Sequence, residues 1–209
     1  MATVFLLSPA FCAGRRANII LRPDSSLPIA MRLRAGALTL GDAFSFMSGL
    51  YFRGKISYAR TFAPSPDATL VITPTRGLQA PDLLITADLV REFAAVDISS
   101  GDIRYREPLE RDLQVLATRI PEARVVLLGS VATGKYVDVL VRWLGERLHF
   151  PTSFIGRGDM SRGGLLLRHA ASGIELDYSV LEPSAKRRGP RPPKLDPRTR
   201  VTMPAGVPE

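Results

Sequence analysis

Three short apolar segments, each closed by a proline or a glycine, constrain the fold most strongly. They are TVFLLS at 3–8, ATLVIT at 68–73 and RVVLLG at 124–129. Apolar runs of this length predict buried strands. Segments with apolar residues at helical spacing lie between the second and third strands, at 86–96 and 106–120. This alternation predicts an α/β fold with a mainly parallel sheet and helices on both faces.

The remaining segments are less regular. The stretch 41–62 is expected to form two helices, broken at Gly49 and Gly54. Two apolar segments near the end, 164–170 and 174–181, flank a short Ala-Ser-Gly turn. That pattern predicts a C-terminal β-hairpin.

The charge of the chain is concentrated at its C-terminal end. Residues 184–209 contain seven Lys or Arg and two acidic residues, a net charge of +5 out of +8 for the whole chain. This segment is also rich in proline and has no apolar periodicity, so it is expected to be disordered when free. The sequence therefore predicts one α/β domain over 1–183 and a basic tail over 184–209. An excess of positive charge favours a polyanionic partner such as DNA.

Cysteine and histidine are too scarce for several kinds of site. Cys12 is the only cysteine, and the two histidines, His149 and His169, are far apart. No disulfide framework, metal site or other cofactor is expected. No apolar run is long enough to span a membrane, so we expect no membrane association and a cytoplasmic location.

Functional loops of such sheets gather at the carboxyl ends of the strands. Three loops have that origin here: 9–16, 74–82 and 129–135. The third one, GSVATGK, fits the phosphate-binding pattern G-x-x-x-x-G-K, but Tyr136 follows where a magnesium-binding Ser or Thr is required. The alternatives are a nucleotide-binding loop, a small-residue turn, and an anion site at a helix amino end.

Several motifs together resemble a known group of proteins. LLSPAFCAGRR at 6–16 and LYFRGKISYA at 50–59 are similar to segments of the YaaA-like proteins. VITPTRGLQAPD at 71–82 and VVLLGSVATGKYVDVL at 125–140 resemble segments of a related domain family of unknown function. The resemblance covers roughly residues 3–145 and implies a uracil-DNA glycosylase-like α/β fold. The chain lacks the water-activating G-Q-D-P-type segment and the late histidine motif of typical uracil-DNA glycosylases.

The resemblance implies an enzyme that acts on DNA. Its expected activity is that of a DNA glycosylase, which cleaves the N-glycosidic bond of a modified base. Phage DNA is an expected source of such bases, and their removal would be a defence. Such an enzyme extrudes the base into a pocket and needs a carboxylate or an aligned water near the sugar. A non-enzymatic YaaA-like nucleic-acid-binding protein and, third, a nucleotide-binding enzyme with a phosphate loop are the alternatives.

Candidate site residues follow from the loops and from this chemistry. Asp82 and Asp159 are the expected catalytic carboxylates, and Tyr51 and Phe52 are candidates for stacking on an extruded base, with core packing as the alternative. Residues that stand beside glycines or small side chains are the expected contacts of nucleic-acid phosphates: Arg15, Arg16, Arg53, Lys55, Arg76, Ser130, Lys135, Arg157 and Arg162.

Overall fold

The computed structural model describes residues 2–132, 134–182, 188–196 and 201. Six strands form one sheet in the order β3-β2-β1-β4-β5-β6. The strands are β1 (Thr3–Leu7), β2 (Thr69–Ile72), β3 (Leu78–Gln79), β4 (Arg124–Leu128), β5 (Leu148–Pro151) and β6 (Tyr178–Val180). The four central strands are parallel, and the two edge strands β3 and β6 are antiparallel to their neighbours. The sheet is therefore mixed, with the predicted parallel part at its centre.

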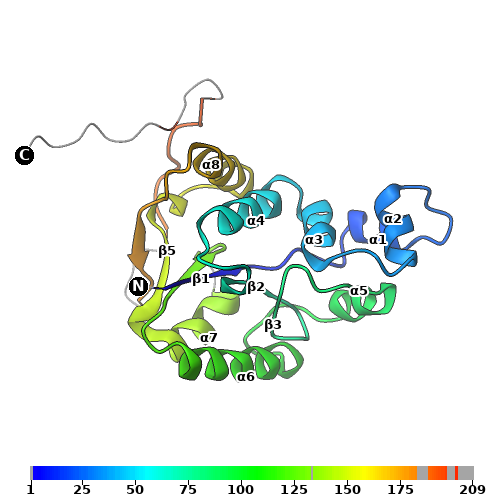
Figure 1. Ribbon diagram of the computed structural model, residues 1–209, viewed down its shortest axis with the longest axis horizontal. Helices are drawn as coiled ribbons and strands as arrows, with labels where there is room; N and C mark the ends of the chain where they lie inside the picture. The colour runs from blue at the N-terminus through cyan, green and yellow to red at the C-terminus, as the bar shows by residue number, and fades with distance from the viewer. Residues whose placement is uncertain (1, 133, 183–187, 197–200, 202–209) are drawn as a thin grey trace, which may run out of the picture.

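Helices cover both faces of this sheet, as predicted (Figure 1). The α-helices are α1 (Arg15–Leu21), α2 (Pro28–Arg34), α3 (Leu40–Ser48), α4 (Leu50–Phe62), α5 (Ala87–Ala94), α6 (Ile103–Arg119), α7 (Gly134–Leu144) and α8 (Asp159–Ser172). Three short 3₁₀ turns are η1 (Pro66–Ala68), η2 (Gly145–Arg147) and η3 (Thr152–Phe154).

Alternate side chains of β1 divide the core into two clusters. Phe5 and Leu7 pack with α3, α4, α5 and α8 on one face. Val4 and Leu6 pack with α6 and α7 on the other face. The two-residue period of a strand thus explains why the short apolar runs of this sequence have no polar side: both of their faces are buried.

Two predictions about glycines and the C-terminal segment are wrong. Residues 164–170 belong to α8 and form no hairpin, and β6 pairs with β5 instead. Gly54 does not break a helix but lies inside α4. Both errors have one cause, because α4 and α8 pack at glycines: a Cβ on Gly54 would lie 2.6 Å from the carbonyl oxygen of Gly163. Gly49, with a φ of 66°, does separate α3 from α4 as predicted.

Part of the basic tail lies on the domain. Residues 188–196 have no regular secondary structure. Leu195 packs on the apolar cluster of α4 and α8, and the Arg188 guanidinium donates a hydrogen bond of 3.4 Å to the carbonyl oxygen of Ala132. This stretch therefore runs from the loop after β4 to the surface of α8.

Candidate functional site

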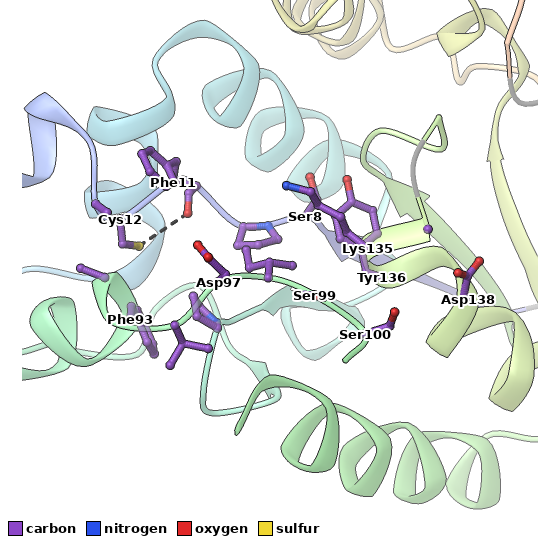
Figure 2. A pocket seen from close by; sticks show the side chains of 18 residues that line it. Ser8, Phe11, Cys12, Phe93, Asp97, Ser99, Ser100, Lys135, Tyr136 and Asp138 are labelled. Carbon is purple, nitrogen blue, oxygen red and sulfur yellow. Dashed lines mark hydrogen bonds between the residues drawn. The ribbon is translucent and has the colours of Figure 1, made fainter. Parts of the chain in front are cut away.

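A cleft of about 620 Å³ lies at the carboxyl ends of β1 and β4. Its walls come from the loop after β1 (residues 8–13), the segment after α5 (96–100) and the start of α7 (134–136) (Figure 2). The chain passes from β1 to β2 on one side and reaches β4 on the other side of β1. In open α/β sheets, ligands bind outside the carboxyl ends of the strands at such a switch point. This cleft is therefore the candidate site.

Ser8 forms part of the cleft wall and is held there from behind by a buried lysine. Lys55 of α4 is 1% exposed. Its Nζ lies 2.6 Å from the carbonyl oxygen of Ser8 and 2.9 Å from the Ser8 Oγ. The rings of Tyr51 and Phe52 lie 4.4 and 4.9 Å from the same nitrogen. The expected stacking residues are thus core residues that enclose Lys55, and neither lines the cleft.

Burial controls the charge of Lys55. Removal from water lowers the pKa of its amine to about 7, an effect that the Asp159 carboxylate opposes and the Arg162 guanidinium reinforces. Lys55 forms no ion pair with a carboxylate in the part of the chain that the structure describes. A buried, unpaired lysine with this pKa exchanges its proton near neutral pH, which is uncommon outside functional sites.

The buried Tyr136 side chain packs against the glycine-rich segment after β4. The Tyr136 hydroxyl accepts a 3.0 Å hydrogen bond from the backbone N–H of Ser130. Burial raises the pKa of the Tyr136 phenol, and the Ser8 hydroxyl partly offsets that effect. Gly129 lets this segment approach β1, since a Cβ there would lie 2.9 Å from the Ser8 Cβ. The Ser130 N–H, which a nucleotide-binding loop would offer to a phosphate, is thus already bonded to Tyr136. Thr133 of the same segment lies outside the described residues.

Two cleft residues escaped the sequence interpretation. Asp97 is exposed and has neither an ion pair nor a hydrogen bond within the described residues. Figure 2 shows it across the cleft from Lys135 and Tyr136. Ser8, the second residue, ends the first predicted strand. The position of Ser8 at the end of a strand could have indicated a site residue. Asp97 follows a helix, and no sequence pattern marked it.

The predicted lysine at the start of α7 does reach this site. Lys135 is exposed, lines the cleft and points toward Ser8 in Figure 2. Among the described residues it forms no ion pair. The amino end of α7 adds the partial positive charge of a helix terminus. This wall of the cleft therefore combines the positive charge of Lys135 and of the helix end with the Asp138 carboxylate, which also lines it.

Asp159 and Arg162 lie behind the cleft rather than in it. Asp159 is the first residue of α8, and its carboxylate lies 3.3 Å from the Arg162 guanidinium. Arg162 is buried and also donates to the carbonyl oxygen of Phe154. Arg162, which was expected to contact a phosphate, thus stabilises the start of α8 instead. Neither Asp159 nor Arg162 lines the cleft.

The expectation that Asp82 lies at the carboxyl edge is wrong. β3 runs antiparallel to β2, so it carries the chain back toward the start of β2. Asp82 consequently borders a hollow beside Thr69, the first residue of β2, and pairs with Arg60 at 2.7 Å. Arg76, from the same loop, pairs with Glu92 of α5 at 2.6 Å and lies outside the cleft.

The other predicted cations lie outside the cleft lining. Arg16 donates to the carbonyl oxygen of Phe46, and so ties α1 to α3. Arg15 and Arg53 are exposed on α1 and α4. Arg157 donates to the carbonyl oxygen of Ser153 and to the Ser161 hydroxyl, and burial lowers the pKa of its guanidinium.

A second hollow, of about 370 Å³, is strongly cationic. Residues 191–195 of the tail form one side of it and the start of α8 forms the other. Four basic side chains line it and, among the residues that the structure describes, no carboxylate does: Arg157, Arg168, Arg191 and Lys194. We call the surface that these four residues line the basic hollow. Arg188, near the start of the tail segment, connects this surface to the loop beside the cleft.

Nothing in the described residues points to a metal, since no three His, Cys, Asp or Glu side chains are grouped to bind one. Across the same residues, every helix is too short or too polar to cross a membrane. Comparisons of the chain with protein-family models, curated proteins and solved structures found no match. The site is therefore interpreted from its own geometry, and the resemblance to the YaaA-like proteins remains an expectation.

Proposed function

We propose that this protein is a DNA-acting enzyme that removes a modified base by cleaving its N-glycosidic bond. The observation that supports this best is a cleft that holds a lysine and an exposed carboxylate on facing walls. The start of α7, with Lys135 and Asp138, forms one wall, and the Asp97 carboxylate lies on the other. A nucleotide extruded from DNA carries matching groups, namely a phosphate and a sugar that becomes positive in the transition state.

The size of the cleft suits one nucleotide. Its volume of about 620 Å³ falls within the usual range for small-molecule sites. A base pair inside a duplex cannot enter such a site, so the base must leave the stack first. Phe11, which is 70% exposed, also lines the cleft and provides an apolar contact surface for a base.

Asp97 has the properties that the chemistry requires. Cleavage of the glycosidic bond places positive charge on the sugar, and water must then add to the sugar carbon. A carboxylate stabilises that charge and accepts a proton from the water. Asp97 forms no ion pair within the described residues, although the Arg104 guanidinium is close enough to interact with it electrostatically. We therefore assign the catalytic carboxylate to Asp97 in place of Asp82.

The basic hollow supports DNA as the carrier of the base. Its four cations have no carboxylate among them in the described part of the chain. Surfaces of this kind attract the sugar-phosphate backbone without reading its sequence. Arg188 lies between the hollow and the cleft, so one DNA strand could follow the tail toward the cleft. Phage DNA is a source of modified bases, which is why we extend the proposal to a defensive role.

The test is the release of a free base from DNA, followed by mass spectrometry. Unmodified DNA and several phage DNAs with different modified bases are incubated with the wild type and with Asp97→Asn. We expect release from at least one modified DNA and a loss of at least about 100-fold in Asp97→Asn. Salt-dependent binding without any release would support the non-enzymatic alternative, which the basic hollow favours, and would refute the enzyme.

A further inference from the structure

The contact between Ser8 and Lys55 has the geometry of a catalytic pair. The Lys55 Nζ lies 2.9 Å from the Ser8 Oγ, within hydrogen-bond distance. Ser8 lines the cleft, whereas Lys55 lies behind it, fully buried between Tyr51 and Phe52. Ser8 is itself 5% exposed, and it separates the amine from the cleft.

The Lys55 Nζ donates to the Ser8 carbonyl oxygen at 2.6 Å and to the Ser8 Oγ at 2.9 Å. A neutral amine can keep the first hydrogen bond with one N–H and turn its lone pair to the Ser8 hydroxyl proton across the same 2.9 Å. An ammonium has no lone pair, so it cannot take the proton of Ser8. Burial lowers the pKa of Lys55 to about 7, which makes the neutral form available at physiological pH.

Ionisable groups from three helices surround this pair. Asp159 and Arg162 of α8 act on Lys55 with opposite sign. Tyr51 of α4 lies beside the amine, and Tyr136 of α7 lies beside the Ser8 hydroxyl. Burial raises the pKa of both phenols, so they stay neutral near pH 7. Lys55, whose pKa burial lowers to about 7, is the member of this set that lies 2.9 Å from the Ser8 Oγ.

We propose that Ser8 is a nucleophile and Lys55 its general base, and that the cleft hydrolyses a small carboxylic ester. This activity is separate from the proposed base release and does not depend on it. Nucleophilic serines need a neighbouring base within hydrogen-bond reach, and lysine fulfils this role when it is neutral.

The reaction proceeds in two balanced steps. The Ser8 Oγ forms a bond to the carbonyl carbon while its proton moves to the Lys55 Nζ. The bond from this carbon to the alcohol oxygen then breaks, and the Lys55 ammonium protonates the departing alcohol. Water next attacks the acyl-serine and gives its proton to Lys55, which returns it to the Ser8 Oγ as the carboxylic acid leaves. Lys135 and the amino end of α7 provide positive charge beside the developing oxyanion.

Covalent labelling of the full chain tests this proposal without DNA. The protein is treated with an alkyl fluorophosphonate between pH 5.5 and 8.5, and the adduct is located by peptide mass spectrometry. We expect one adduct, on Ser8, whose rate of formation rises about tenfold per pH unit below pH 7 and levels off above it. Ser99 and Ser100 line the same cleft without a lysine contact, and serve as internal controls that stay unlabelled.

A variant separates catalysis from structure. Lys55→Met keeps a side chain of similar length between the two rings but cannot accept a proton. Labelling of Ser8 is expected to fall at least about 100-fold in this variant while its circular dichroism spectrum stays unchanged. No adduct on Ser8, or equal labelling in the folded variant, would overturn the proposal. If Lys55→Met does not fold, the pH dependence of Ser8 labelling in the wild type is the deciding test. A labelling rate that does not rise toward pH 7 would also overturn the proposal.

Discussion

Two adjacent glycines of α8 should respond in opposite ways to the same substitution. A Cβ on Gly163 would lie 2.7 Å from the carbonyl oxygen of Leu50 and 2.8 Å from the Cα of Tyr51. Both atoms belong to the backbone of α4, which cannot move aside by a change of rotamer. A Cβ on Gly164 would meet only the Leu195 Cδ1, at 3.9 Å, an ordinary contact. Gly163→Ala therefore forces α4 and α8 apart, and Gly164→Ala does not.

The expected magnitudes follow from two opposing terms. Overpacking costs about 1–3 kcal/mol, and alanine gains up to about 1 kcal/mol over glycine in a helix interior. We expect Gly163→Ala to lower the free energy of unfolding by about 1–2 kcal/mol and Gly164→Ala to raise it by up to about 1 kcal/mol. For a chain of this length the melting temperature should fall by roughly 2–8 °C in the first variant and rise by up to roughly 2–4 °C in the second.

Thermal unfolding followed by circular dichroism measures both variants under the same conditions. Because both substitutions make the same chemical change one position apart, helix propensity cancels in their difference. A Gly163→Ala protein as stable as Gly164→Ala would refute the close packing of α4 against α8. It would also remove the explanation for the burial of Lys55, because α8 covers the part of α4 that carries it.

Three further predictions concern charge. The pKa of Lys55 falls from an ordinary 10.5 to about 7 on folding, so between these two pH values the unfolded chain binds one more proton than the folded chain. Urea unfolding should therefore show that the stability of the wild type, measured relative to Lys55→Met, rises with pH in this window. Parallel curves of stability against pH for the two proteins would contradict this prediction. Asp82→Asn should leave base release within about twofold of wild type, unlike Asp97→Asn, because Asp82 lies beside the start of β2. Replacing Arg191 and Lys194 by alanine should weaken DNA binding and lower the slope of log affinity against log salt by about 1–2, which fluorescence anisotropy at several salt concentrations measures.

Local patterns predicted most of the elements. Short apolar runs predicted β1, β2 and β4. The helical spacing at 86–96 predicted α5, which begins after the Thr86 cap, whose side chain accepts from the backbone N–H of Leu89. These features depend on residues close in sequence, so a single sequence contains the information. The error at 164–170 has the opposite origin. Leucine-rich segments fit a strand or a helix, and here the contact of Gly163 with α4 decides for the helix.

The sequence by itself determined that this chain alternates buried strands with helices, that a turn with small residues follows its third main strand, and that its cations concentrate at the C-terminal end. Tertiary structure alone decided which of the chemically capable residues meet. It placed Lys55 against Ser8, 47 positions away, and moved Asp82 to the opposite edge of the sheet. The physical reason is that burial and long-range contact set the pKa of a lysine and the reach of a carboxylate, and neither quantity is encoded in local residue spacing.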